Sequence, residues 1–94
     1  MDDLTMLTGV FPNPSNAKTT VSFALKREGR IKIAIYDLAG RRLTLLSDHE
    51  FAAGPHYLTW NGRDSEGELM PSGTYVVRLE TKSRVESRKV TWFR

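Results

Sequence analysis

Hydrophobic and polar residues alternate with a period of two along much of this chain. The runs KTTVSFAL, RIKIAIYD and GTYVVRLE show the alternation, and β-branched or aromatic residues occupy many of their apolar positions. Such alternation is typical of a β-strand that turns one face to a core and the other to solvent, and the residue types agree with strand propensity. No window of about ten residues has the apolar stripe of a helix. The pattern therefore predicts an all-β protein.

Turn-forming residues separate seven predicted strands, near residues 5–11, 18–26, 30–37, 41–50, 56–61, 73–82 and 85–93. FPNPSN (11–16) is predicted to be a loop, because it holds two prolines and two asparagines. REGR (27–30) and DLAGRR (37–42) are predicted to be tight hairpin turns, with Gly29 and Gly40 supplying positive φ. Seven short strands with connections of varied length favour an antiparallel β-sandwich over the alternative, a barrel.

The inward positions of these strands define a predicted core. It comprises Val21, Phe23, Leu25, Ile31, Ile33, Ile35, Leu43, Leu45, Leu58, Trp60, Tyr75, Val77, Leu79, Val90 and Trp92. Burying each large apolar side chain is worth ~1.5–3 kcal/mol before the loss of entropy is counted. The length of 94 residues fits one domain, spanning residues 1–94, with residues 1–10 as the first strand and its lead-in.

The stretch WNGRDSEGELMPSGTY (60–75) contains the densest group of acidic residues, Asp64, Glu66 and Glu68. A calcium loop is one interpretation, since hard cations prefer several oxygen ligands. However, Leu69 stands where an EF-hand loop needs glycine, and Tyr75 stands where it needs glutamate. We therefore expect a solvated connection between two strands, with the polar tips of its flanking aromatic residues directed toward its backbone.

Composition and charge exclude several kinds of site. The net charge is +3 and the sequence pI is about 9.5, but the basic residues are scattered, which does not predict a dedicated nucleic-acid patch. The chain has no cysteine, so no disulfide or zinc knuckle is expected. No apolar run approaches the ~20 residues of a membrane span, and the acidic start MDDLTMLTGVF does not resemble a signal peptide.

No residue pattern predicts catalysis. The two histidines, His49 and His56, lie near turns and away from any nucleophile motif, so a structural or surface role is expected for both. No phosphate-binding or dinucleotide motif is present, and no cofactor is predicted. A sugar-stacking platform is a further hypothesis, for which the candidate aromatic residues are Phe51, Tyr57, Trp60, Trp92 and Phe93. The two tryptophans fall on the inward phase, whereas Phe93 falls on the outward phase.

The order of motifs along the chain resembles a known bacterial module. The segments NPSNAKTTVSFAL, IKIAIYDLAGRRLTLL, AAGPHYLTWNGRDSEGELMPSGTYVVRLET and SRKVTWFR follow one another in that order. The most specific pieces are Asn13–Pro14, Tyr36–Gly40, Trp60–Gly67 and Pro71–Tyr75. Over residues 11–94 or so, the chain resembles the C-terminal sorting domain of type nine secretion cargo proteins. It resembles equally the immunoglobulin-like domain of the flagellar hook-capping protein.

This resemblance implies a seven-stranded antiparallel immunoglobulin-like β-sandwich without enzymatic activity. As a sorting domain, it would be recognised by the outer-membrane secretion machinery, in the periplasm in transit and then at the cell surface or outside the cell. Its partners would be proteins, with no nucleic acid or small-molecule substrate, and with outer-membrane association only through those proteins. The alternatives are a structural or assembly domain, such as a hook-cap domain or a spacer, and a carbohydrate-binding module.

The resemblance also implies a set of partner-recognition residues near the end of the chain. The late motifs of the sorting family map onto Gly73, Tyr75 and Lys89, and a sorting domain also typically ends with a basic residue, here Arg94. Arg88 is expected to join Lys89 and Arg94 in a basic face on the last strand. The last strand departs from the family in having one lysine, and the alternative is that these charges protect a sheet edge from aggregation.

Overall fold

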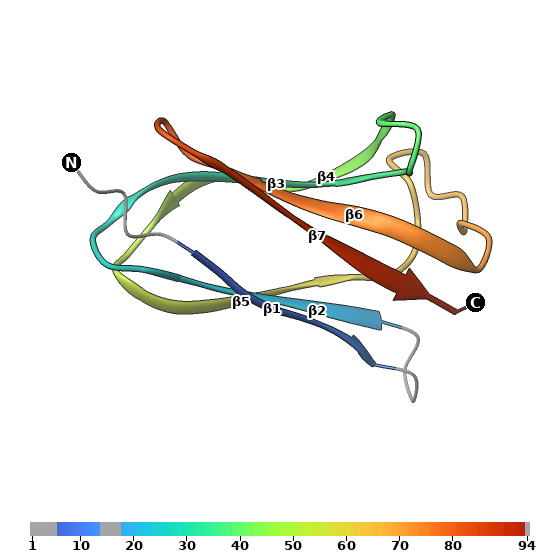
Figure 1. Ribbon diagram of the computed structural model, residues 1–94, viewed down its shortest axis with the longest axis horizontal. Helices are drawn as coiled ribbons and strands as arrows, with labels where there is room; N and C mark the ends of the chain where they lie inside the picture. Colours follow the sequence, from blue (N-terminus) through green and yellow to red (C-terminus); the bar gives the residue numbers. More distant parts are fainter. Residues whose placement is uncertain (1–5, 14–17, 94) are drawn as a thin grey trace.

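The computed structural model describes residues 6–13 and 18–93, which form two stacked layers of antiparallel strands (Figure 1). The strands are β1 (Met6–Asn13), β2 (Lys18–Leu25), β3 (Gly29–Tyr36), β4 (Arg42–Phe51), β5 (Gly54–Trp60), β6 (Gly73–Glu80) and β7 (Val85–Trp92). One sheet has the order β1-β2-β5 and the other has the order β4-β3-β6-β7. The predicted seven-stranded sandwich is therefore confirmed, and the barrel is not formed.

Consecutive strands either pair within one sheet or lie in different sheets. β3 pairs with β4 and β6 pairs with β7 within one sheet, whereas the chain changes sheets from β2 to β3, from β4 to β5 and from β5 to β6. The two changes after β4 bring β5 to the far side of β2 and return the chain to β6 beside β3. Within the described ranges, no helix has the length and apolarity needed to cross a membrane.

The core lies between the two sheets and matches most of the predicted set. The buried apolar residues are Leu7, Val21, Phe23, Leu25, Ile31, Ile33, Ala34, Ile35, Leu43, Trp60, Tyr75, Val77, Leu79, Val90 and Trp92. Leu7 is an addition to the predicted core, and Leu58 is half-buried against it. Ala34 is buried as well, but it alternates with the inward Ile33 and Ile35 and lies outside the core cluster. Phe93 is exposed, as its phase predicts.

The prediction that Leu45 lies in the core is wrong, because β4 contains a bulge. The pairing of β3 with β4 shifts between Ile33, opposite Ser47, and Ala34, opposite Leu45, so Leu46 has no partner. An extra residue reverses the faces of the residues that follow it in a strand. Leu45 is consequently 41% exposed, while Leu46 packs against the core.

Two predicted loop features are also wrong. Gly29 begins β3 without positive φ, and the turn before it joins strands of different sheets and is no hairpin. Residues 11–13, predicted to be a loop, instead continue β1 opposite β2. β1 tolerates Pro12 because it is an edge strand, where a missing N–H can face outward. The turn at Gly40 is confirmed, with φ of 90° and a backbone hydrogen bond of 3.1 Å from its N–H to the carbonyl of Asp37.

The connection between β5 and β6 is held by the polar tips of three buried aromatic residues. The Trp60 indole donates to the Arg63 carbonyl at 2.9 Å, and the Trp92 indole donates to the Met70 carbonyl at 3.2 Å. The Tyr75 hydroxyl donates to the Pro71 carbonyl, four residues earlier, at 2.6 Å. This last contact is the tyrosine corner of immunoglobulin-like sandwiches. These three hydrogen bonds therefore attach the backbone of the connection to buried side chains of the core.

The first prediction concerns Gly62, which lies in this connection beneath Trp92. Its φ of +79° disfavours any side chain, and an added Cβ would overlap the Trp92 ring. Gly67 is the matched control, because its φ is +85° but a Cβ there meets open space. We expect Gly67→Ala to cost ~1–2 kcal/mol through backbone strain. Gly62→Ala should cost ~1–3 kcal/mol more through overpacking. Urea unfolding of both variants measures the difference, and equal losses would contradict the close packing at Gly62.

The second prediction concerns the pH dependence of Tyr75. Burial, assisted by the negative charge of Asp37, raises the pKa of its phenol above the ordinary value of 10.0. The unfolded chain thus releases the phenol proton at a lower pH than the folded chain does. The stabilisation is complete below about pH 10 and decreases as the pH rises through the folded-state pKa.

Tyr75→Phe should lose about 1 kcal/mol at neutral pH, because the hydrogen bond to Pro71 disappears. The difference in unfolding free energy between the native chain and this variant should then shrink above about pH 10. Denaturant titrations at several pH values between neutral and alkaline conditions measure that difference. A difference that stays constant across this range would disprove the assignment.

Candidate functional site

The residues implied in partner recognition lie along the hairpin of β6 and β7. Gly73 is opposite Trp92 and Tyr75 is opposite Val90, while Lys89 is opposite Val76. Gly73, Tyr75, Arg88 and Lys89 therefore share one pair of strands, whereas Arg94 lies outside the described residues. The role of these residues in recognition stays a prediction.

Arg88 and Lys89 do not form a common basic face. Consecutive residues of a strand point to opposite sides of the sheet. Val90 and Trp92 are buried, so Arg88 shares their inward side and Lys89 points outward. The expectation of one basic face on the last strand is therefore wrong for these two residues.

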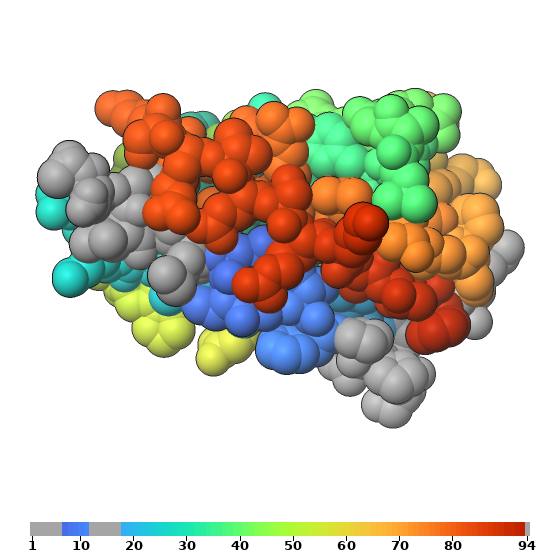
Figure 2. All heavy atoms as spheres, viewed as in Figure 1, coloured from blue at the N-terminus to red at the C-terminus, as the bar shows by residue number. Residues whose placement is uncertain are grey.

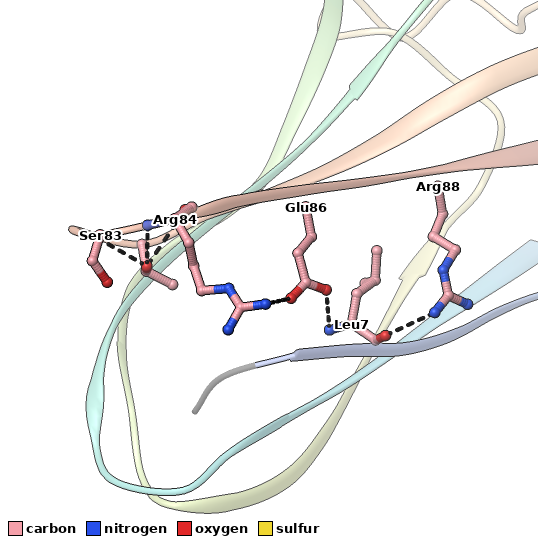
Figure 3. A network of polar contacts seen from close by, with 6 residues as sticks. Leu7, Ser83, Arg84, Glu86 and Arg88 are labelled. Atoms are coloured by element: carbon pink, nitrogen blue, oxygen red, sulfur yellow. Dashed lines mark hydrogen bonds and ion pairs between the residues drawn. The ribbon is translucent and has the colours of Figure 1, made fainter. Parts of the chain in front are cut away.

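Arg88 instead helps to join the two sheets along one side of the sandwich (Figure 3). Its guanidinium donates to the Leu7 carbonyl of β1 at 3.1 Å, and the Glu86 carboxylate accepts from the Leu7 N–H at 2.9 Å. Arg84 donates to the second oxygen of Glu86 at 2.6 Å. We call the contacts of Glu86 and Arg88 with Leu7 the β1–β7 seam. In Figure 2, atoms of β7 lie directly against atoms of β1.

Glu86 was absent from the predicted site, although the sequence contains a signal for it. Counting back by two from Trp92 and Val90 gives Arg88 and then Glu86, which places both on the inward phase of β7. Charged residues on an inward phase at a sheet edge are a known device for limiting unwanted strand pairing. The seam therefore supports the alternative role for Arg88, that of protecting an edge.

Tyr75 has a clear role in the fold. Its side chain is 7% exposed, and its hydroxyl is engaged by the Pro71 carbonyl. Gly73 begins β6 opposite Trp92, and a Cβ at this position would meet no atom. The Gly-x-Tyr motif thus places a tyrosine in the core at the start of a strand.

The outer face of the four-stranded sheet is charged, with both signs interleaved. Lys32 of β3 lies between Asp48 of β4 and Glu80 of β6. Arg30 contacts Asp48 at 3.0 Å and Arg78 contacts Glu80 at 3.0 Å. Exposed pairs of this kind contribute little to stability. The carboxylates between the basic residues make this face unsuitable as a continuous phosphate-binding surface.

The outer face of the three-stranded sheet is different, because it consists mainly of uncharged side chains. Phe11 of β1 lies opposite Thr20, and Tyr57 of β5 lies opposite Ser22. The hydroxyl groups of Thr8 and Ser22 share a hydrogen bond of 2.7 Å. Phe11 and Tyr57 are 55% and 68% exposed. The two outer faces of the sandwich therefore differ in charge: the four-stranded sheet presents charged side chains, and the three-stranded sheet presents mainly uncharged ones.

The acidic connection has a structural explanation. The Asp64 Oδ1 atom accepts the backbone N–H groups of Glu66 at 3.0 Å and Glu68 at 2.9 Å, and the Arg63 guanidinium donates to the Gly67 carbonyl at 2.9 Å. Within the described part of the chain, no group of three acidic, histidine or cysteine side chains is arranged to hold a metal ion. The carboxylate of Asp64 serves to shape the turn.

The histidines contact backbone and aromatic groups. His49 stacks on Phe51 with ring centroids 4.3 Å apart, and His56 stacks on Phe23 at 5.5 Å. A ring nitrogen of His49 lies 2.9 Å from the Glu50 carbonyl, and one of His56 lies 2.7 Å from that of Ala52. None of these contacts pairs a histidine with a nucleophile, as covalent catalysis with a histidine base would require.

Comparison with known proteins finds similarities to flagellar proteins. Residues 13–84 match the family model of the FlgD Ig-like domain. The chain is 27% identical over 78 residues to the basal-body rod modification protein FlgD of Salmonella typhimurium, and equally to that of Salmonella typhi. The matches cover 80% of this chain but 34% of each relative, so the chain spans about a third of their length.

Solved structures give the same result for the fold. FlgD from P. aeruginosa has a TM-score of 0.67 and 21% identity, covering 96% of this chain and 74% of that chain. FlgD from Xanthomonas campestris, whose structure was described in relation to hook capping in flagellar assembly, has a TM-score of 0.62 and 20% identity, covering 93% and 60%. These similarities show an immunoglobulin-like sandwich. The family model also matches more than half of the length of this chain, which therefore belongs to the family of FlgD Ig-like domains.

Proposed function

We propose that this chain is a non-enzymatic, protein-binding assembly domain that acts in capping the flagellar hook. The observation that carries the proposal is the match of residues 13–84 to the FlgD Ig-like domain. The similarity to the Salmonella FlgD proteins and the FlgD fold neighbours supports it. This favours the alternative of the sequence analysis over its main interpretation, a type nine sorting module. The proposed location is the flagellar structure at the cell surface.

The geometry of the molecule supports a part in assembly. The motif residues Trp60, Gly62 and Tyr75 are occupied in holding the sandwich together. The described surface offers two dissimilar sheet faces, one charged and one largely uncharged. Such a module needs a rigid scaffold and partner-matched surfaces, without an enclosed reaction site.

The carbohydrate-binding alternative is weakened by the position of the aromatic residues. Trp60 and Trp92 are 1% and 2% exposed, so neither can stack on a sugar. Phe51 is half-buried. Tyr57 and Phe93 are exposed, but Tyr57 lies in β5 of one sheet, whereas Phe93 directly follows β7 of the other sheet. These five aromatic residues therefore do not form the coplanar platform that the hypothesis requires.

The third prediction tests the function by deletion. Removing the coding segment for residues 13–84 from the gene in its own organism should abolish hook assembly and swimming. Electron microscopy of the flagellar structures and motility assays measure the effect. The intact gene should restore hooks, and so should the Gly67→Ala variant, because its added methyl group meets open space and its backbone strain costs only ~1–2 kcal/mol. Secreted proteins should remain at their normal location in the deletion strain.

The same experiment discriminates the two interpretations of the family resemblance. Normal hooks in the deletion strain, together with retention of the parent protein in the periplasm, would overturn the hook-capping proposal in favour of sorting. Loss of hooks with normal delivery of surface proteins would be the expected outcome. Surface proteomics of the same cells provides the second measurement.

A further inference from the structure

β5 forms one free edge of the three-stranded sheet, and it lacks the usual protection of an edge. Its pairing with β2 continues through seven residue pairs without a bulge. The strand, GPHYLTW, contains no lysine, arginine, aspartate or glutamate. Exposed edges are normally blunted by bulges, charges or proline, because their unpaired backbone groups attract other strands. The proline here stands near the beginning of the strand and leaves the rest of the edge unprotected.

Two prolines indicate which backbone groups of this sheet face outward. Proline within a sheet lies where its missing N–H would point away from the neighbouring strand. Pro55 of β5 therefore implies that Tyr57 and Thr59, two and four residues later, also direct their N–H and C=O groups to the free edge. By the same rule, Pro12 of β1 directs its backbone groups away from β2. Its opposite residue, Thr19 of β2, pairs with Trp60 of β5 on the other side.

The opposite edge of the same sheet shows the contrast. A register shift between Leu7 and Gly9 moves the alternation set by Pro12 by one residue, so that Leu7 faces outward. At β1, the N–H and C=O of Leu7 face outward, and the side chains of Glu86 and Arg88 bind both groups. At β5, no described side chain forms a hydrogen bond with the backbone N–H or C=O of Tyr57 or Thr59. Within the described part of the chain, side chains therefore bind the outward groups of Leu7 at one edge, whereas Tyr57 and Thr59 at the other edge have no such side-chain partner.

The other free edge on this side of the sandwich belongs to β4, which is protected. β4 has two register shifts in its pairing with β3 and carries Arg42, Asp48 and Glu50. The two sheets approach one another less closely at β4 and β5 than at β1 and β7. Between them lies an open groove of about 510 Å³.

The groove has a small apolar part and a basic rim. Leu46 of β4 and Trp60 of β5 line it. Lys18, Arg63 and Asp64 also line it. The Asp64 Oδ1 atom accepts two backbone N–H groups, and one nitrogen of the Arg63 guanidinium donates to the Gly67 carbonyl. The two cations therefore outnumber the one carboxylate, and the rim is complementary to an acidic side chain.

We propose that the free edge of β5 accepts an extended segment of a partner protein as an additional strand. The segment's backbone pairs with the outward groups of Tyr57 and Thr59, and its alternate side chains enter the groove beside Leu46. An acidic residue of the segment contacts Lys18 and Arg63. Strand addition of this kind gains affinity from main-chain hydrogen bonds and specificity from the pockets for alternate side chains. The inference rests on the proposed function in that it requires a protein partner.

The fourth prediction tests strand addition with selected peptides. A displayed library of random peptides of about ten residues, the upper range of a strand, is selected on the 94-residue chain. The selected peptides should be acidic and extended. Amide hydrogen exchange, followed by NMR, should show that binding protects the N–H groups of Tyr57 and Thr59 more than those of β1.

The matched variants are Thr59→Pro and Thr59→Ala. Proline at this position removes an N–H that points away from β2, so it blocks the added strand while the pairing with β2 remains. Alanine keeps the N–H. We expect binding to weaken about tenfold or more in Thr59→Pro, as loss of a main-chain hydrogen bond and steric exclusion imply, and to change little in Thr59→Ala. Thermal unfolding checks that both variants are folded.

A second pair of variants keeps the test decisive if Thr59→Pro does not fold. Lys18→Glu combined with Arg63→Glu should weaken the acidic peptides about tenfold and favour basic ones, whereas the outer-face control Lys89→Glu should change neither. Selected peptides that bind equally well to all variants, or a selection that yields none, would overturn the inference. Sedimentation showing that the chain alone pairs through β5 would also overturn it, in favour of a second copy.

This test is separate from the deletion experiment. Loss of hooks on deletion, combined with no strand-adding peptide, would reject the β5 site and leave the assembly function standing. Normal hooks combined with peptide binding at β5 would reject hook capping and retain a strand-accepting edge for another protein partner.

Discussion

The contact of Trp60 with Tyr75 and Trp92 is the interaction on which the rest of the structure depends. Trp60 belongs to the three-stranded sheet, and its ring centroid lies 5.3 Å from the rings of both partners in the other sheet. Each aromatic residue also has a polar atom that requires a partner when buried. The carbonyls of Arg63, Met70 and Pro71 supply those partners. One cluster thus joins the sheets and sets the path of the long connection above it.

The sequence predicted the parts of the fold that follow from local chemistry. The period of two located the strands, and the inward phase placed Trp60 and Trp92 in the core, because both depend only on neighbouring residues. Errors arose where distant pairing decided the outcome. The exposure of Leu45 depends on a bulge opposite β3, and the strand conformation at Pro12 depends on β1 being an edge. Neither constraint is visible within the local sequence.

The functional site was less predictable for a related reason. The motifs that carry the family resemblance hold residues such as Gly62 and Tyr75, which are required by packing and hydrogen bonding in the sandwich. Any family that uses this sandwich needs similar residues, so the motifs indicate the fold more sharply than the partner. The position of Arg88 illustrates the limit. We expected its guanidinium to contact a partner protein. Instead, it donates to the backbone of β1, eighty-one residues away in the chain.

That sequence separation has a consequence for the order in which the chain folds. The β1–β7 seam joins Leu7 to residues that are synthesised 79 and 81 positions later. Contacts between such distant positions carry a large entropic cost of loop closure and form after the local hairpins. During synthesis, the outward groups of Leu7 therefore stay unpaired until β7 has emerged. Until β7 has formed, the edge of β1 at Leu7 is therefore exposed and can pair with other incomplete chains. Formation of β7 covers this edge and removes that route to aggregation.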